Sequence, residues 1–246
     1  MSSVNSNQKR MLITGATSGI GLELAKQAVD HGWKVTACGR NPQKLNELKK
    51  SLMVETILFD VTNGSETAHS LLNVEWDIAV LNAGTCEYVD IEKFEPAMFK
   101  RVFDTNFFGV INCVAALLRS SGAGKSFVIV DSMARMFPFT RAEAYGSSKA
   151  ALHYFAQSLK VDLATKGVNV QTVSPGFVET PLTDENDFDM PMLIGVEEAA
   201  QDLLKGIEQG KDNITFPTRF SLIMKTLNLL PSFLQVYLSK KMRPRL

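Results

Sequence analysis

The sequence contains little of what marks a secreted or metal-binding protein. Its only three cysteines, Cys38, Cys86 and Cys113, are scattered, with no CxxC pair and no nearby histidine cluster. This pattern argues against a disulfide framework and against a zinc site, and nothing else in the chain suggests a metal. We interpret the three cysteines as small core residues in a reducing compartment.

Long apolar runs and an excess of one charge are also missing. No stretch reaches the ~18 uninterrupted apolar residues of a membrane span, and the polar first ten residues lead only into the short run Met11–Ile13, which is no signal-peptide core. We therefore expect a soluble protein of the cytoplasm. The 26 basic and 26 acidic residues cancel, which gives no argument for a nucleic-acid partner.

The rest of the composition is ordinary for a globular protein, with 45% hydrophobic and 21% charged residues in a chain of 246. Strand-like and helix-like segments alternate from Arg10 to Phe216, with no repeat or linker between them. This alternation predicts a Rossmann-type α/β fold, a doubly wound parallel sheet of about seven strands with helices on both faces. We expect one domain over 1–246, with a dinucleotide-binding and catalytic core at 10–217 and an extension at 218–246.

A tyrosine and a lysine suggest acid–base chemistry. Tyr145 and Lys149 lie four residues apart on a predicted helix, Tyr145–Lys166, so they share one face. An ammonium beside a phenol favours the phenolate, so we expect the tyrosine pKa to fall from about 10 toward neutrality. Alone, this pair is more often a surface turn. Ser132 at the end of an apolar run upstream, and a glycine-rich turn near the N-terminus, favour a site instead.

The glycine-rich turn follows the predicted strand Arg10–Thr14 and precedes a helical pattern. Strand, glycine turn and helix together aim backbone N–H groups at a phosphate. The candidate cofactor-binding residues in this turn are Gly15, Thr17, Ser18, Gly19, Ile20 and Gly21. The second predicted strand, Lys34–Cys38, ends in Gly39 and Arg40 without a carboxylate. A guanidinium there suits a 2′-phosphate, which favours NADP(H) over NAD(H), although a surface arginine is the alternative.

In combination, these motifs resemble those of the classical short-chain dehydrogenases/reductases over roughly residues 10–217. The matching motifs are the TGxxxGIG turn, Asn82-Ala83-Gly84 after a buried strand, Asn106 in an apolar helix, Ser132, Tyr145 with Lys149, and Pro175-Gly176. The resemblance implies that Ser132 hydrogen-bonds the substrate oxygen and that Tyr145 donates the proton. It implies that Lys149 lowers the tyrosine pKa and binds the nicotinamide ribose, and that Asn106 anchors a water.

The same resemblance implies further contacts to the cofactor. Beyond the glycine turn and Arg40, they are expected from Asp60, Val61, Asn82, Ala83, Gly84, Tyr145, Lys149, Pro175, Gly176, Val178 and Thr180. Two of the motif residues have simpler interpretations. Asp60 is also a suitable turn or helix N-cap residue, and Asn106 could be a helix-surface amide.

The resemblance implies an NADP-dependent oxidoreductase that interconverts a carbonyl and a secondary alcohol by hydride transfer. Met133–Phe139, Phe177 and Phe188 favour an apolar ketone or aldehyde as substrate, although Met133–Phe139 could equally be core. The fold does not select among substrates. The alternatives are an NADP-binding regulatory protein and a peripheral membrane protein with little turnover. A homodimer or tetramer is expected, and the departure from the family pattern at Ile214–Pro217 favours the dimer.

Two further segments are expected near the substrate or the surface. The acidic stretch Thr183–Gly195 stands where the resembled family has its lid, and its carboxylates Asp184, Glu185, Asp187 and Asp189 predict a mobile, solvated segment. The extension predicts two amphipathic helices separated by Pro231 and followed by Lys240, Lys241, Arg243 and Arg245. We expect it to pack over the domain or across a dimer, with a lipid-surface element as the alternative.

Overall fold

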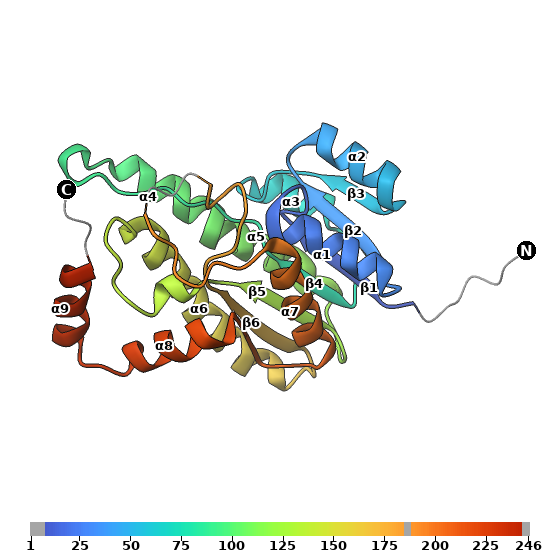
Figure 1. Ribbon diagram of the computed structural model, residues 1–246. Helices are drawn as coiled ribbons and strands as arrows, with labels where there is room; N and C mark the ends of the chain where they lie inside the picture. Colours follow the sequence, from blue (N-terminus) through green and yellow to red (C-terminus); the bar gives the residue numbers. More distant parts are fainter. Residues whose placement is uncertain (1–7, 185–187, 243–246) are drawn as a thin grey trace, which may run out of the picture.

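A parallel sheet forms the centre of the molecule in the computed structural model, which describes residues 8–184 and 188–242 (Figure 1). Its seven strands lie in the order β3-β2-β1-β4-β5-β6-β7. They are β1 Arg10–Thr14, β2 Lys34–Gly39, β3 Glu55–Leu58, β4 Ile78–Leu81, β5 Ser126–Val130, β6 Asn169–Pro175 and β7 Asn213–Phe216. The predicted α/β fold class is confirmed.

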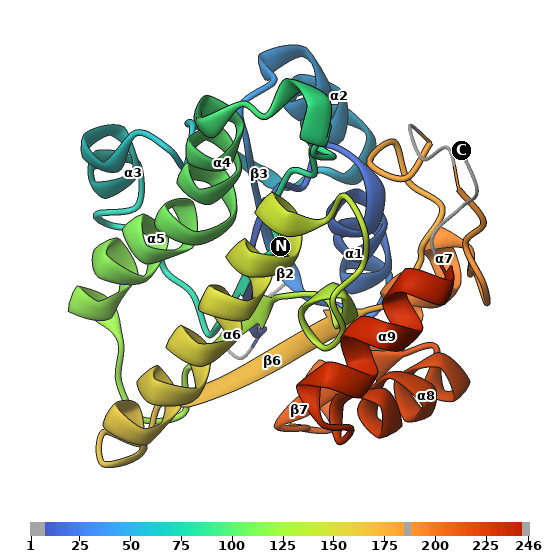
Figure 2. The ribbon, with the colours of Figure 1, turned by 90° about the vertical axis from the view of Figure 1, so that its left-hand side faces the viewer.

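Nine α-helices and four short helical segments lie among the described residues. They are α1 Gly19–Asp30, α2 Pro42–Leu52, α3 Gly64–Ser70, α4 Pro96–Phe103, α5 Gly109–Leu117, α6 Glu143–Ala164, α7 Val196–Glu208, α8 Thr218–Asn228 and α9 Ser232–Met242, with η1 Ile91–Lys93, η2 Asp104–Phe108, η3 Leu118–Ser120 and η4 Met133–Arg135. Figure 2 shows α1 and α7 on one side of the sheet and α3 to α6 on the other.

Each face of the sheet has its own hydrophobic core. Along β1, Met11 and Ile13 join the core under α1, α2 and α7, whereas Leu12 between them joins the core under α5 and α6. Alternation along a strand sends neighbouring side chains to opposite faces, so a strand covered by helices on both sides is apolar throughout. This is why the strands appear in the sequence as continuous apolar runs.

The topology brings polar residues together at one edge. The strand order reverses between β1 and β4, and parallel strands end at the same edge of the sheet. In open α/β sheets, ligands bind beyond the carboxyl ends of the strands at this reversal. The segments that follow β1, β4, β5 and β6 therefore meet there, and they carry the glycine turn, Asn82, Ser132 and Pro175.

One stretch, Pro96–Ser120, is the only helix of the described residues that is long and apolar enough to cross a membrane. Core helices of soluble proteins pass the same test, and here Val110, Cys113 and Leu117 are buried in the second core. The stretch is interrupted by the π-helical turn η2 around Asn106. Such turns occur frequently at functional sites.

The helix α3 has no counterpart among the predicted elements. Of its residues only Thr67 is buried, so no apolar periodicity signals it. Its start depends on a cap instead, because the Asn63 side chain accepts a hydrogen bond from the Glu66 amide at 3.1 Å.

The C-terminal extension folds into α8 and α9, on either side of Pro231. On the inner side of α8, Phe220 and Met224 pack on Met133, Met136 and Phe137 in a third cluster of buried residues. This contact supports the core interpretation of Met133–Phe139. In contrast to the amphipathic prediction, α9 has no buried residue. Of the predicted basic and acidic residues, Glu185, Asp187, Arg243 and Arg245 lie outside the described residues.

Candidate active site

Ser132, Tyr145 and Lys149 come together beyond the end of β5. The Lys149 Nζ atom donates to the Val130 carbonyl at 2.9 Å and lies 5.9 Å from the centre of the Tyr145 ring. Ser132 and Tyr145 are linked by a side-chain hydrogen bond. The Ser132 Oγ atom also accepts from the Ala134 amide at 3.1 Å, which caps η4 and fixes the serine rotamer. A proton donor, a second hydroxyl and a cation therefore share one small volume.

The pKa of Tyr145 differs in direction from the expectation. Burial raises it above the ordinary tyrosine value, Cys86 and Asp131 raise it further, and only the Ser132 hydrogen bond lowers it. The predicted lowering of the tyrosine pKa is wrong, because desolvation of the phenolate by burial is the largest influence and raises the pKa. Tyr145 is therefore a neutral acid at physiological pH, which is the form that donates a proton.

Burial acts on Lys149 in the opposite direction. Desolvation lowers the pKa of its ammonium to about 8, against which Asp131 and Cys86 act weakly. Its side chain is nearly inaccessible, with 4% of the residue exposed. A buried cation in this position lowers the free energy of unfolding. The simplest reason for its presence is therefore a role in function rather than in stability.

Asn106 is fully buried, which excludes the helix-surface interpretation. Its Oδ1 atom accepts from the Thr85 amide at 2.8 Å, and its Nδ2 atom donates to the Thr85 carbonyl at 2.9 Å and to Ser148 Oγ at 3.0 Å. Ser148 in turn donates to the Tyr145 carbonyl at 2.7 Å. The π-helical turn that carries Asn106 is thereby tied to the helix that carries Tyr145.

A polar cluster directly behind Ser132 was missed by the sequence reasoning. The buried Asp131 carboxylate accepts from His153 Nδ1 at 2.6 Å and from Arg135 Nε at 3.1 Å, and also from Ser174 Oγ. No motif in the sequence marks Arg135 or His153 as members of a site. Aspartate in an apolar strand end needs such partners, but the sequence does not reveal which residues supply them.

Cys86 was interpreted as a core residue, and this is wrong. Cys38 and Cys113 are buried, but Cys86 is partly exposed and lies close enough to Tyr145 and Lys149 to raise the pKa of both. It follows Gly84 in the loop after β4, so it ends up at the edge where the strands end. A scattered cysteine without a motif gives no sequence signal for this position.

A chain of packed aromatic rings begins at Tyr88, which lies near Tyr145. The Tyr88 ring packs edge-on against Phe188 at 5.6 Å between centroids, and Phe188 packs on Phe177 at 6.1 Å. Phe177 packs in turn on Phe220 of α8 at 5.5 Å. The segment after β6 is held at its base by hydrogen bonds between Ile194 and the chain at 177–179. We call Tyr88, Phe177 and Phe188 the aromatic wall, because their rings together form one apolar surface.

The glycine turn has the shape needed for a dinucleotide. A Cβ atom on Gly15 would lie 2.9 Å from Ala83 Cα, and one on Gly21 would lie 2.4 Å from the Gly15 carbonyl oxygen. Gly15 and Gly19 also adopt positive φ angles of 67° and 51°. The side chain of the N-cap residue Ser18 makes no capping hydrogen bond, and the first turn of α1 has no acidic residue. The residues therefore fit a bound pyrophosphate.

The Asn82–Gly84 segment is fixed against this turn. Thr14 Oγ1 accepts from the Asn82 and Ala83 amides at 3.0 and 3.1 Å. A Cβ atom on Gly84 would lie 3.3 Å from Asn106 Oδ1 and 3.5 Å from Lys149 Nζ. The absent side chain therefore keeps space open beside Asn106 and Lys149.

Arg40 and Asp60 lie together beyond the ends of β2 and β3. Arg40 Nη1 is 3.9 Å from Asp60 Oδ2, and the arginine side chain is 76% exposed. Asp60 Oδ1 accepts from the Thr62 amide and hydroxyl at 2.9 Å each, which bears out the turn interpretation of this aspartate. The Val61 carbonyl accepts from Asn112 Nδ2 at 2.8 Å. An exposed guanidinium here is free to meet a phosphate.

The other residues predicted to bind the cofactor differ in what they contact. Thr17 packs over Gly39, and Ile20 packs in the first core, so its backbone rather than its side chain faces the turn. Pro175 ends β6, and the Gly176 amide donates to the Phe216 carbonyl at 2.8 Å. Val178 is buried, and Thr180 lies against Gly19.

A groove beside α9 is a separate feature. It has a volume of about 690 Å³ and lies between the loop at 134–140, the first turns of α6 and helix α9. Gly146, Ser147 and Ala150 line it from a different face of α6 than the one that bears Tyr145 and Lys149. We place the reaction at the hydrogen-bonded residues rather than in this groove.

The family model for short chain dehydrogenases matches residues 9–190. The chain belongs to the short-chain dehydrogenase family, whose members are oxidoreductases. It is 32% identical to an uncharacterized oxidoreductase of Myxococcus xanthus over 90% of this chain and 92% of that protein. It is 34% identical to a serine 3-dehydrogenase of Rhizobium radiobacter over 80% of each. A 3-dehydrosphinganine reductase of Arabidopsis thaliana is 28% identical over 84% of this chain and 69% of that protein.

Solved structures of this short-chain dehydrogenase family share the fold. A short chain dehydrogenase from Burkholderia cenocepacia in complex with NADP superposes with a TM-score of 0.83, at 24% identity, over 94% of this chain and 97% of that one. The closed form of serine dehydrogenase complexed with NADP⁺ gives a TM-score of 0.75 at 24% identity, over 84% and 92%.

The buried cation gives a stability prediction for this dehydrogenase. The pKa of Lys149 is lowered to about 8 in the folded protein from 10.5. The charge therefore opposes folding at about pH 7, and this cost disappears as pH rises through about 8 toward the unfolded value. We expect Lys149→Met to unfold at a higher temperature than the wild type at about pH 7, with the difference shrinking at alkaline pH.

Differential scanning fluorimetry across that pH range measures the difference. Lys166→Met, an exposed position just after the same helix, serves as the control and should show no pH-dependent gain. A lower melting temperature for Lys149→Met at about pH 7 would mean that the bond to Val130 outweighs the desolvation cost.

Proposed function

We propose that this protein is an NADPH-dependent reductase that converts an apolar ketone or aldehyde to an alcohol. The observation that carries the proposal is the meeting of Ser132, Tyr145 and buried Lys149 beside a glycine turn that fits a pyrophosphate. Hydride transfer to a carbonyl requires a proton donor for the oxygen that becomes negative and a donor that stabilises it. This constellation supplies both.

In the proposed reaction, the Ser132 hydroxyl donates a hydrogen bond to the substrate oxygen and Tyr145 transfers its proton to that oxygen. Bound NADPH supplies the hydride to the carbonyl carbon. The Lys149 ammonium stabilises the phenolate left on Tyr145, so the raised pKa of the resting phenol is offset during the reaction. The Asn106–Ser148 link holds the helix of Tyr145 in register. In this proposal Asn106 also anchors the water that returns the proton.

The choice of NADP rests on the second strand. Gly39 and Arg40 follow β2 without a carboxylate, and the Arg40 side chain is 76% exposed. The ion pair between Arg40 and Asp60 is 3.9 Å long and solvent-exposed, so it is weak. Arg40 can therefore leave Asp60 and bind a 2′-phosphate instead, which forms a stronger charge-assisted hydrogen bond. The NADP complexes of related dehydrogenases support this choice. NAD is the alternative.

The apolar substrate is proposed from the aromatic wall of Tyr88, Phe177 and Phe188. The 3-dehydrosphinganine reductase relative is compatible with an apolar ketone, whereas the serine 3-dehydrogenase relative favours a polar substrate. Both belong in the assay.

We further propose a cytoplasmic homodimer. The reduced state of Cys38, Cys86 and Cys113 suits the cytoplasm. On α6, Tyr154 and Val161 lie two turns apart on one side of the helix and are 77% and 73% exposed, which leaves apolar surface for a second copy to cover. Sedimentation equilibrium that returns a monomer mass at micromolar concentration would contradict the dimer.

The activity test is NADPH oxidation against ketones and aldehydes graded from small and polar to long and apolar. We expect rates to rise with apolar size and Tyr145→Phe to lose about 10²-fold or more in kcat, because the proton donor is gone. NADPH binding, measured by fluorescence, should persist. Tyr154→Phe makes the same change at an exposed site on the same helix and should keep full activity.

Two outcomes would oppose the proposal. If the protein oxidised serine with NADP⁺ and reduced no apolar ketone, the substrate would be polar and the proposed apolar substrate would be wrong. Cofactor binding without turnover on the whole panel would favour the alternative of an NADP-binding regulatory protein.

The cofactor test uses Arg40→Ser. Loss of a charge-assisted bond to the 2′-phosphate should raise the KM or Kd for NADPH roughly 10-fold to 100-fold and leave that for NADH unchanged. Arg119→Ser, an exposed arginine in η3, is the matched control. Equal changes for both cofactors would show that Arg40 does not read the phosphate.

A further inference from the structure

The two ends of the sequence differ sharply in charge. Residues 1–212 hold 20 of the 26 basic residues and all 26 acidic ones, a net charge of −6. Residues 213–246 hold the other six basic residues and no acidic one, a net charge of +6. The overall net charge of zero therefore conceals a basic C-terminal segment, and α8 and α9 form the described part of it.

These two helices make one corner of the molecule. In Figure 1, α8 runs along the lower edge and α9 turns upward beyond it at the left-hand end. The outward sides of both helices carry large apolar side chains. Their exposed side chains include Leu222 at 69%, Leu229 at 84%, Phe233 at 69% and Tyr237 at 57%. We call this surface the α8–α9 corner. It is defined by these four apolar residues together with Arg219, Lys225, Lys240 and Lys241.

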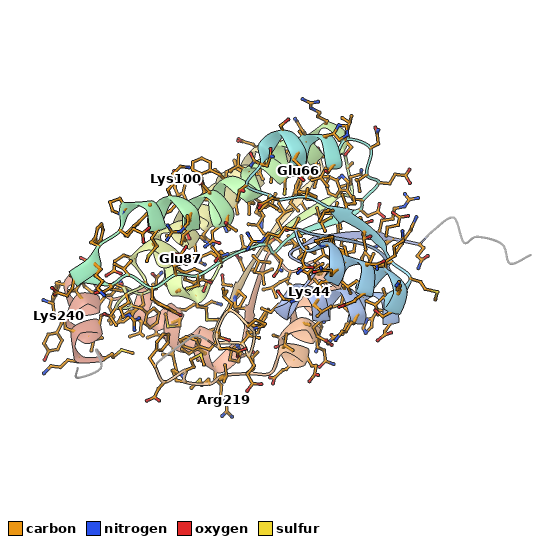
Figure 3. All side chains as sticks on the ribbon, turned by 90° about the horizontal axis from the view of Figure 1, so that it is seen from above. Lys44, Glu66, Glu87, Lys100, Arg219 and Lys240 are labelled. Carbon is orange, nitrogen blue, oxygen red and sulfur yellow. The ribbon has the colours of Figure 1, made fainter. Side chains whose placement is uncertain are left out.

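Basic side chains surround the apolar ones. Arg219 and Lys225 lie on the exposed side of α8, and Lys240 and Lys241 lie in the last turn of α9. Within residues 8–184 and 188–242, none of the four takes part in an ion pair. Figure 3 shows Arg219 and Lys240 on the outer edge of the molecule. A helix with apolar and aromatic residues outward and cations beside them suits an anionic bilayer surface.

Only the inner sides of the helices are engaged in the fold. Phe220 and Met224 hold α8 on the third core, and α9 adds Leu238 to it. Ser239 Oγ donates to the Pro138 carbonyl. The fold therefore buries one side of this segment and leaves the other side exposed. The exposed apolar residues of the α8–α9 corner lower the solubility of the protein unless a partner covers them.

A second copy of the chain fits this surface less well. A two-fold interface places each patch against itself, so four basic residues would face four more without an acidic one between them. A head-to-tail contact avoids this repulsion but generates open chains unless it closes. Lipid phosphates oppose the cations directly, and the acyl boundary accepts the apolar side chains.

We propose that the α8–α9 corner docks the protein on an anionic lipid bilayer. Leu229, Phe233 and Tyr237 enter the boundary between headgroups and acyl chains, and the four cations meet lipid phosphates. The proposal concerns binding alone and does not depend on the reductase activity. It assigns the outer side of the extension a partner, whereas its inner side serves the fold.

The test is co-sedimentation of the full-length protein, without cofactor or substrate, with phosphatidylcholine vesicles that do or do not contain about 30% phosphatidylglycerol. We expect the wild type to sediment with the anionic vesicles and to be released by salt. Lys240→Glu with Lys241→Glu should weaken this partitioning about tenfold or more, since each charge near the surface contributes independently.

Matched controls separate the corner from general effects. Lys44→Glu with Lys49→Glu makes the same change in net charge on α2 and should bind as the wild type. Leu229→Ser with Phe233→Ser should reduce binding, whereas Met53→Ser with Leu72→Ser, at exposed positions on the opposite edge, should not. Circular dichroism and the melting temperature check that each variant is folded.

Three results would overturn the proposal. The wild type could remain in the supernatant with both vesicle types, or the corner variants could bind as tightly as their controls. Finally, sedimentation velocity without lipid could show a dimer that Leu229→Ser with Phe233→Ser converts to monomer, in which case a second copy covers the corner.

Discussion

The arrangement of the candidate site depends on one buried ammonium. Lys149 reaches from α6 to the last carbonyl of β5, and its bond to Val130 joins the helix of Tyr145 to the strand that leads into Ser132. Burial lowers its pKa to about 8, so it keeps its charge near neutral pH at the expense of stability. The Asp131 carboxylate behind it opposes this lowering, and is itself held by Arg135 and His153.

The second constraint is geometric. A π-helical turn places Asn106 inside the protein, where its amide bonds Thr85 in the loop after β4 and Ser148 on α6. The loop after β4 and the catalytic helix are thereby fixed to each other across the open edge of the sheet. The glycine turn after β1 closes against the same loop, with no room for a Cβ atom at Gly15. The glycine turn and Tyr145 are thus held at the same edge of the sheet by these contacts.

The sequence predicted the parts of this architecture that depend on local pattern. The strands, the glycine turn and the Tyr145–Lys149 spacing follow from periodicity and from neighbours along the chain, and the first strand was predicted at its observed bounds, Arg10–Thr14. The Asp131 cluster was not predictable, because His153 and Ser174 lie 22 and 43 residues away and only the fold brings them together. The raised pKa of Tyr145 was missed for a related reason, since spacing reports the neighbouring charge but not the depth of burial.

The titration of Lys149 itself tests the account most directly. Nuclear magnetic resonance of protein with isotope-labelled lysine, assigned through Lys149→Met, follows the side-chain signal as pH is raised. The account predicts a midpoint near the value of about 8 that burial imposes, well separated from the exposed lysines. A midpoint at the ordinary value of 10.5 would contradict it, because the ammonium would then be solvated rather than fixed between β5 and α6.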